Sequence, residues 1–355
     1  MRIDQLIPAY HRGDAVGDTA THLKEFFLSQ GFQSQIYCLT CDSGLEPESS
    51  LFSQFPQPKA SDIAILHFAL PSLLTQAFIN LPTKKVIIYH NITPSHFFIE
   101  FDQELARLTH LGRQELKSLI PYVSLALADS DYNRQELVDF GFKRAEVFPL
   151  FVDFEKYKKP ISPLMYELMR DERLNILFVG RIAPNKKIED LIKVTFYYKK
   201  YISPLVRLII IGKTSSVPKY YESLIHLADE FYLQPEEICF TGHIPDEEMF
   251  ALYRASDVFL SLSEHEGFCL PLLESMIFDL PIVAYDSTAV PYTLAGAGIL
   301  VKEKRPDHLA ELLAEVVHNQ LLREKIITSQ RQRLKQFKQL EQEKFLLQTL
   351  KSLMK

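Results

Sequence analysis

Short apolar runs rich in β-forming residues alternate with helical stretches along this chain, and they do so in two consecutive blocks. Most runs are continuous in valine, isoleucine, leucine and phenylalanine, which is typical of parallel strands buried on both faces. Helical stretches such as 20–31 and 187–200 fall between most of them. The alternation therefore predicts an α/β protein with two doubly wound domains. The expected strands are residues 2–8, 33–39, 62–68, 84–90, 122–129 and 145–151 in the first block, and 174–180, 206–212, 237–242, 257–263, 280–285 and 298–301 in the second.

The segment 151–175 is expected to join the two blocks, because it is charged, contains two prolines and includes no strand-like run. A length of 355 residues suits two domains, and a net charge of −6 argues against a nucleic-acid binder. The helical tail 321–355 carries nine Lys and Arg residues and three Glu, so its charge is +6 against −12 for the rest. Docking on the protein itself and contact with anionic lipid both remain open for this tail.

No stretch reaches the roughly 18 uncharged apolar residues that span a bilayer, and the first ten residues lack the apolar core of a secretory signal. The four cysteines, Cys38, Cys41, Cys239 and Cys269, do not form a disulfide framework in a chain of this length and are expected to be reduced thiols. We therefore expect a cytoplasmic protein, with peripheral contact at the inner membrane face as the option left by the tail.

The stretch 261–285 carries the clearest chemical signal. A strand-like run ends at Ser263, a short loop follows, and a helix is expected to start near Leu270. The loop thus lies at the carboxyl end of a strand, where open α/β sheets bind ligands, and the free amides of a helix start favour an anion. Glu266 in the loop and Glu274 one turn into the helix would add carboxylates for hydroxyl groups. Stabilisation of the helix start by acidic residues is the alternative.

A second signal is the stretch 177–192, in which a strand ends at Gly180 and two cations flank a short Pro-Asn loop. Arg181 and Lys186 could clamp a diphosphate, the first as a fork and the second as a point charge. Alone, these cations could equally be solvated surface residues. They become significant because they are expected at the same edge of the sheet as the loop that carries Glu266.

Residues 266–274 resemble the Glu, seven residues, Glu motif of retaining, GT-B-fold glycosyltransferases of the large family-four type, the glycosyl transferases group 1. Gly180-Arg181 followed by Pro184 and Lys186 is similar to the diphosphate-binding stretch of the same family, and residues 241–268 are similar to its approach to the motif. The resemblance covers the second domain nearly throughout.

This resemblance implies two Rossmann-like domains that face a cleft. The first would comprise residues 1–155, completed by a C-terminal crossover helix at 338–355, and would take the acceptor. The second, residues 172–337, would bind the nucleotide sugar. The implied reaction moves a hexose, with retention, from GDP-mannose or a UDP-hexose to a saccharide, lipid-linked or small-molecule acceptor in cell-surface polysaccharide or glycolipid synthesis. It implies no cofactor and no metal.

The resemblance also implies roles for individual residues. Glu274 would hold the ribose, Glu266 the transferred sugar, and Arg181 and Lys186 the departing diphosphate. His90, in a stretch (89–98) similar to the family's, would lie near the donor sugar unless it is merely a packed or capping histidine. The implied catalytic residues are Glu266, His90, Arg181 and Lys186, and the implied donor-binding residues are Gly17, Gly180, Arg181, Lys186, Glu266, Gly267, Phe268, Cys269, Leu270 and Glu274.

The first domain departs from the family in its first loop. Many members have two adjacent glycines there, whereas Gly13 and Gly17 are separated in this chain, and we take Gly17 as the matching position. Residues 129–131 read Asp-Ser-Asp, the metal-binding pattern of the other major glycosyltransferase fold, but Ser130 or Asp131 as a helix N-cap explains them, and we expect no metal there. Two other functions stay open: a GT-B-fold sugar-nucleotide epimerase and a non-catalytic sugar-nucleotide-binding protein.

Overall fold

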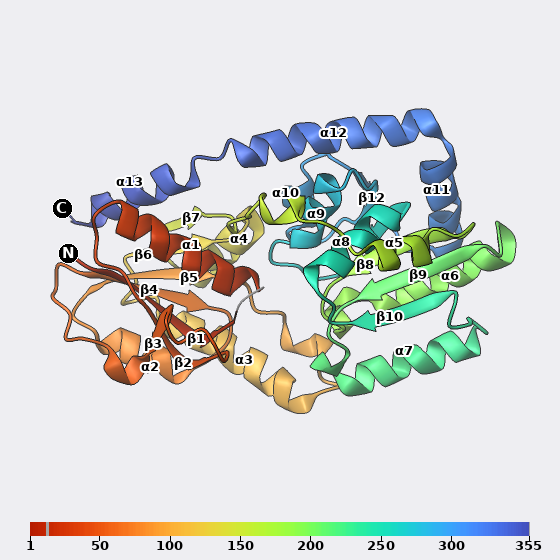
Figure 1. The fold of residues 1–355 in the computed structure, drawn as a ribbon. Coiled ribbons are helices and arrows are strands. Elements are labelled where there is room, and N and C mark those ends of the chain that lie inside the picture. Colours follow the sequence, from red (N-terminus) through yellow and green to blue (C-terminus); the bar gives the residue numbers. More distant parts are fainter. Residues whose placement is uncertain (12–13, 355) are drawn as a thin grey trace. The chain divides into compact units, whose positions relative to one another are not determined.

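The computed structural model describes residues 1–11 and 14–354, and the chain divides into two compact units. Each unit is a parallel sheet with helices packed against its two faces (Figure 1). Unit 1 comprises Met1–Ser95, Glu104–Val152 and Glu341–Lys355, and unit 2 comprises His96–Gln103 and Asp153–Leu340. The α/β fold with two doubly wound sheets is therefore confirmed, and each unit is described separately below.

Unit 1 has a seven-stranded sheet in the order β3-β2-β1-β4-β5-β6-β7. Its strands are β1 (Ile3–Tyr10), β2 (Ile36–Cys41), β3 (Ser49–Leu51), β4 (Ile63–Phe68), β5 (Lys84–Tyr89), β6 (Leu125–Ala128) and β7 (Ala145–Val147). Its helices are α1 (Ala15–Ser29), α2 (Leu73–Asn80), α3 (Gln103–Ser118), α4 (Asp131–Phe140) and α13 (Gln342–Met354), with a short 3-10 turn at Phe52–Gln54. A second 3-10 turn, Ser95–Phe97, lies where the chain passes from unit 1 to unit 2. The strand order reverses between β1 and β4, which makes this pair the switch point of the sheet.

Two hydrophobic clusters lie on the two faces of this sheet. Neighbouring residues of one strand, such as Ile65 and Leu66 of β4, belong to different clusters, because successive side chains point to opposite faces of a sheet. One cluster joins the sheet to α2, α3 and α4. The other joins it to α1 and α13, and Leu346 and Leu350 of α13 are completely buried there. The last helix of the chain, α13, is thus part of the core of unit 1, the unit that also contains the first residues of the chain.

Unit 2 has a six-stranded parallel sheet in the order β10-β9-β8-β11-β12-β13, with its switch point between β8 and β11. Its strands are β8 (Leu174–Val179), β9 (Val206–Ile211), β10 (Ile238–Gly242), β11 (Val258–Ser261), β12 (Ile282–Tyr285) and β13 (Ile299–Val301). Its helices are α5 (Pro163–Met169), α6 (Ile188–Tyr201), α7 (Pro218–Glu230), α8 (Asp246–Ala255), α9 (Leu270–Ile277), α10 (Val290–Leu294), α11 (Pro306–His318) and α12 (Gln320–Lys338), with 3-10 turns at Lys156–Lys158, Pro184–Lys186 and Thr214–Ser216.

Three details differ from the sequence-based expectation. The three-residue strand β3 was not predicted, because so short a run has no readable period. Residues 96–103, placed by sequence in the first domain, group with unit 2. The tail is two helices instead of one: α12 ends at Lys338 and belongs to unit 2, and only α13 returns to unit 1. Within the described residues, none of these helices is both long and apolar enough to cross a bilayer.

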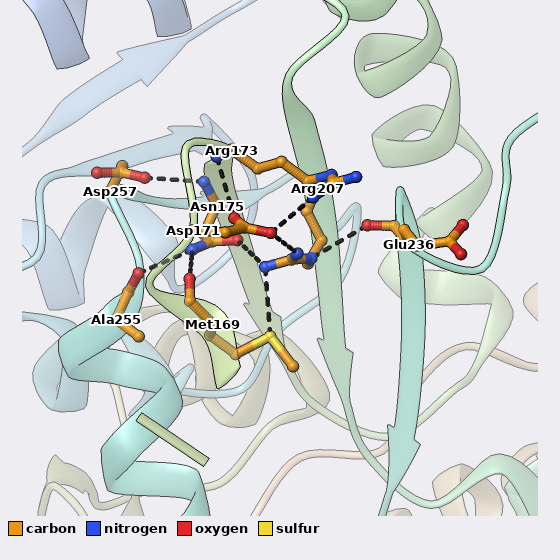
Figure 2. A network of polar contacts seen from close by, with 8 residues as sticks. All are labelled: Met169, Asp171, Arg173, Asn175, Arg207, Glu236, Ala255 and Asp257. Atoms are coloured by element: carbon orange, nitrogen blue, oxygen red, sulfur yellow. Dashed lines mark hydrogen bonds and ion pairs between the residues drawn. The ribbon is translucent and has the colours of Figure 1, made fainter. Parts of the chain in front are cut away.

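A polar network fixes the amino ends of β8, β9 and β11, at the edge of the sheet opposite the loops considered below (Figure 2). The buried Arg207 donates to Asp171 Oδ2 at 2.5 Å and to Asn175 Oδ1 at 3.1 Å. Burial alone would raise the pKa of Asp171, but the backbone N–H of Arg173 and the Arg207 guanidinium hold that pKa below its usual value. A carboxyl with a lowered pKa stabilises the folded state above its usual pKa, and this contribution is lost as the pH falls.

We expect Asp171→Asn to lower the free energy of unfolding by about 1–3 kcal/mol at neutral pH, because Arg207 loses its charged acceptor. The difference from the wild type should shrink as the pH falls below the usual Asp value of 3.8. Urea unfolding at several pH values measures both effects. Asp307→Asn is the control, since Asp307 also pairs with an arginine, Arg305, at 2.7 Å but on the surface. Equal losses in the two variants would contradict this account.

Candidate functional site

The loops that follow β8 and β11 lie side by side at the switch point of unit 2. Asn185 joins them: its carbonyl accepts from the backbone N–H of Glu264 at 2.8 Å, and its side-chain amide donates to the carbonyl of His265 at 2.9 Å. Asn185 is buried, so both bonds are shielded from water. A buried asparagine between the loops therefore sets the separation of the residues that follow it in each loop. The sequence did not single it out.

Lys186 and Glu266 meet across this junction. Lys186 Nζ lies 2.7 Å from both Glu266 carboxylate oxygens, and the two side chains are 14% and 8% exposed. Gly180 borders the pair, because a Cβ on this residue would lie 3.9 Å from Lys186 Cε and 3.2 Å from the Phe178 ring. Arg181 follows on the exposed surface. The two sequence signals thus form one site, with a cation and a carboxylate held together at its centre.

Helix α9 begins at this site. Cys269 precedes its first residue, Leu270, in the left-handed conformation with φ = 66°. Gly267 and the buried Phe268 complete the loop, and the Phe268 carbonyl accepts a hydrogen bond from the Thr293 hydroxyl. Pro271 has no N–H and the Leu272 N–H donates to the Cys269 carbonyl at 3.1 Å, so an anion here would be met by the amides that lead into α9 up to Leu270.

Cys269 is buried beside Glu266, and burial together with that negative charge raises the pKa of the thiol well above its usual value. A neutral buried thiol is a poor nucleophile and a poor metal ligand. Each of the four cysteines, all of which the structure describes, is a free thiol. The structure therefore gives Cys269 a role in the shape and backbone of the site.

Glu274 lies in the first turns of α9 with its carboxylate held from two sides. Tyr157 donates to Oε1 at 2.9 Å and Tyr253 donates to Oε2 at 2.7 Å. Burial and the neighbouring carboxylate raise the pKa of Tyr253 well above its usual value, so its hydroxyl stays a donor. Both tyrosines were missed by the sequence analysis. Tyr157 stands in the linker and Tyr253 in α8, and no local pattern connects either of them to Glu274.

Residues 96–103 border the same loop of unit 2. The Phe97 ring lies 6.2 Å from that of His265, and Phe101 contacts Tyr220 edge-on at 5.1 Å. His265, which stands between Glu264 and Glu266 in the sequence, is itself buried. Residues 96–103 therefore approach unit 2 at two places, the loop that carries Glu266 and the first turn of α7.

In unit 1, Gly17 stands in the first turn of α1. A Cβ there would lie 1.8 Å from the carbonyl oxygen of His11, so only glycine fits. The amides at this helix start already have an acceptor, since Asp14 Oδ1 takes the N–H groups of Val16 and Gly17 at 2.8 and 2.7 Å. Gly13 lies outside the described residues. The structure thus supplies a packing reason for Gly17, and its contact with the donor phosphate remains a prediction.

His90 directly follows β5 in unit 1 and has hydrogen bonds at both ring nitrogens. Nδ1 lies 3.0 Å from Asp129 Oδ2, and Nε2 lies 3.0 Å from His67 Nδ1. His67 Nε2 in turn lies 2.9 Å from Gln5 Oε1, and the side chains of His90 and Asp129 are each 3% exposed. Sequence reasoning singled out His90, but it identified neither His67 as its hydrogen-bond partner nor Asp129 as its counter-charge.

The Asp-Ser-Asp stretch serves three structural purposes. Asp129 contacts His90, the Ser130 hydroxyl caps α4 by accepting the Asn133 N–H at 3.2 Å, and Asp131 pairs with Arg134 at 2.7 Å on the surface. The helix-cap interpretation is therefore confirmed. In the part of the chain that the structure describes, no three His, Cys, Asp or Glu side chains gather closely enough to hold a metal ion.

Known proteins resemble this chain over part or all of its length. The family model for glycosyl transferases group 1 matches residues 167–333, which include Arg181, Lys186, Glu266 and Glu274. The chain is 30% identical to the serotype-specific mannosyltransferase WbdA of Escherichia coli over 33% of its own length and 14% of the relative's. It is 25% identical to the GDP-mannose-dependent alpha-mannosyltransferase of Mycobacterium tuberculosis over 72% of its own length and 65% of the relative's. It therefore spans less than two thirds of either relative.

Among solved structures, the Anabaena protein Alr3699/HepE in complex with UDP-glucose superposes with a TM-score of 0.75 at 16% identity, covering 99% of this chain and 100% of that one. At this identity the likeness concerns the fold alone. The order of the strands, the two units and this superposition give the chain the two-domain α/β fold of the GT-B type.

Proposed function

We propose, because residues 167–333 match the family model for glycosyl transferases group 1, that the chain belongs to this family and transfers a hexose from a nucleotide-diphosphate sugar to a saccharide acceptor with retention of configuration. The observation that carries this proposal is the pairing of Lys186 with Glu266 at the switch point of unit 2, beside the start of α9. A cation, backbone amides that lead into a helix and two fixed carboxylates suit one ligand that bears both phosphate and hydroxyl groups.

In this proposal Glu274 holds the ribose hydroxyls, and Tyr157 and Tyr253 keep its carboxylate in place. Glu266 accepts hydroxyls of the transferred sugar. The leaving diphosphate gains negative charge as the glycosidic bond breaks, and Lys186, Arg181 and the α9 amides stabilise that charge. Groups fixed before the reaction need no reorganisation in the transition state, which is why such donors lower the barrier.

Mannose from GDP-mannose is the donor we propose first, because two of the relatives bear the names of mannosyltransferases and one of them is named as dependent on GDP-mannose. UDP-glucose is the second candidate, since it is bound in the Anabaena structure. We propose a saccharide of a cell-surface polymer as acceptor, free or linked to lipid. Exposed lysines of α12 and α13, such as Lys325, Lys335 and Lys351, would favour peripheral contact with an anionic membrane.

The proposed function is tested with a panel of nucleotide sugars. A ligand that binds only the folded protein raises its melting temperature, so GDP-mannose or a UDP-hexose should do so while nucleoside monophosphates do less. The stabilising donor is then incubated with saccharide acceptors, and NMR of the product should show the anomeric configuration of the donor. A changed sugar without acceptor would indicate an epimerase, and binding without turnover on any acceptor would indicate a non-catalytic protein.

Glu274→Gln tests the ribose site. We expect the affinity for GDP or UDP to fall by roughly 10–100-fold, because hydrogen bonds to a charged group contribute about 1.5–3 kcal/mol. Isothermal titration calorimetry measures the change. Glu311→Gln, an exposed position on α11 of the same unit, is the control and should bind as the wild type does. Unchanged affinity in Glu274→Gln would remove this residue from the proposed site.

A further inference from the structure

A chain of buried hydrogen bonds runs through unit 1 from a backbone carbonyl to a carboxylate. It begins at Ala20, whose carbonyl accepts from the Gln5 amide at 2.8 Å, and continues through His67 and His90 to Asp129. The rings of His67 and His90 lie nearly parallel, 6° apart, with centroids 5.3 Å from each other. The Ala20 carbonyl can only accept a hydrogen bond, and the same holds for the Asp129 carboxylate when it is ionised. With an acceptor at each end of this series, the donor and the acceptor of every bond between them can be assigned.

The direction follows step by step from Ala20. Its carbonyl requires the Gln5 Nε2 group, so Gln5 Oε1 must face His67 and accept the proton of His67 Nε2. Burial and the charge of His90 lower the pKa of His67 well below its usual value, so His67 stays neutral. A neutral ring protonated at Nε2 has a lone pair at Nδ1. His67 Nδ1 therefore accepts from His90 Nε2.

His90 is thereby protonated at Nε2, and its other nitrogen faces Asp129 Oδ2 at 3.0 Å. A lone pair at His90 Nδ1 would oppose the lone pairs of the carboxylate, so this bond also needs a proton. His90 is the one hydrogen-bond partner of the Asp129 carboxylate among the described residues, because Asp129 Oδ1 has none there. Burial raises the pKa of Asp129, and the charge of His90 opposes that rise.

We propose that Asp129 and His67 are positioning residues that hold His90 as a doubly protonated imidazolium in a fixed ring orientation. The role in catalysis rests on the proposed glycosyl transfer. With both nitrogens donating inside the protein, His90 cannot take the proton of an acceptor hydroxyl. It instead supplies a fixed positive charge at the carboxyl edge of the unit 1 sheet, and among the described residues the titratable groups bonded to its ring are Asp129 and His67.

The protonation state is measured by NMR of the full chain labelled with 15N-histidine, with the His90 signals assigned from their loss in His90→Gln. We expect two protonated ring nitrogens in the wild type at neutral pH. Asp129→Asn keeps the shape of the side chain but removes its charge, so His90 should become a neutral ring. Asp131→Asn, from the same stretch but on the surface, is the control and should leave the His90 signals unchanged.

A neutral His90 in the wild type would overturn the proposal. Should Asp129→Asn fail to fold, His67→Gln provides the second variant, since its amide oxygen can accept the same His90 N–H. The His90 ring should stay doubly protonated in His67→Gln, and loss of that state there would count against the assigned direction of the bonds. These measurements need no substrate, so they stand even if the chain transfers no sugar.

Kinetics test the catalytic part separately. With an active donor and acceptor, Asp129→Asn should lower kcat by roughly 10–100-fold with little change in KM, as loss of a charge-stabilising group does. Asp131→Asn should keep the wild-type kcat and KM. An unchanged kcat in Asp129→Asn, alongside a neutral ring, would refute the catalytic role.

Discussion

Replacing Lys186 by alanine is expected to lower turnover by roughly 10²–10³-fold, the loss typical of removing one group that stabilises transition-state charge. Lys186 is mostly buried, and its Nζ lies 2.7 Å from both oxygens of Glu266. The charge that it supplies acts on the departing diphosphate. Binding of the nucleoside monophosphate, which lacks the outer phosphate, should therefore change far less than kcat.

The comparison with Arg181 and Lys158 sharpens this test. Arg181→Ala should lower turnover in the same way, while its exposed position predicts an unaltered melting temperature. Lys158→Ala removes a lysine that also pairs with a glutamate, Glu155, but on the surface, and both activity and stability should remain. Steady-state kinetics with calorimetric binding of the monophosphate separate the effects. Near-normal turnover in both Lys186→Ala and Arg181→Ala would exclude the assigned roles.

Replacing Leu346 or Leu350 by alanine is expected to destabilise unit 1 by about 2–5 kcal/mol each, the usual cost of a large cavity in a core. Both side chains are fully buried against the cluster that joins α1, α13 and the sheet. Urea unfolding measures the loss. Leu340→Ala, at a position 46% exposed between the last two helices, is the control and should cost little.

Deletion of residues 338–355 extends this test to the whole helix. The shortened chain should melt at a lower temperature and lose solubility, because the apolar face that α13 covers becomes exposed. Binding to anionic vesicles is measured beside the melting temperature. If the shortened chain melts like the full chain but no longer binds vesicles, the helix serves as a membrane contact and not as part of the core.

Features encoded by neighbouring residues were predictable from the sequence. The continuous apolar runs of β4 and β9 determine buried parallel strands, and the strand, loop and helix start that carry Glu266 and Glu274 follow from local sequence as well. β3 was not predictable, because three residues carry no period and its pairing with β2 depends on the rest of the sheet. Residues 96–103 read as a connection in unit 1, and only their contacts reveal that they pack on unit 2.

The hydrogen-bond partners of the site residues could not be predicted from the sequence, for a related reason. Tyr157 and Glu274 are 117 positions apart, and His67 and His90 come from different strands. Such contacts depend on the order of strands in the sheet, which a pattern in one segment does not contain. The apolar spacing of 337–354 suggested one helix, yet Phe337 packs beside Phe268 in unit 2 while Leu350 packs in unit 1. Periodicity identified the buried faces without identifying the surfaces that bury them.

The return of α13 to unit 1 has a consequence for how the chain folds as it leaves the ribosome. Leu346 and Leu350 belong to the first core, yet they are synthesised after all of residues 153–340. At a synthesis rate of roughly 5–20 residues per second, that core waits about 10–40 s for its last helix. Unit 2 has all of its own residues before then. The part of the chain that is made first is therefore completed last, and during that interval the apolar face of its sheet is open to chaperones.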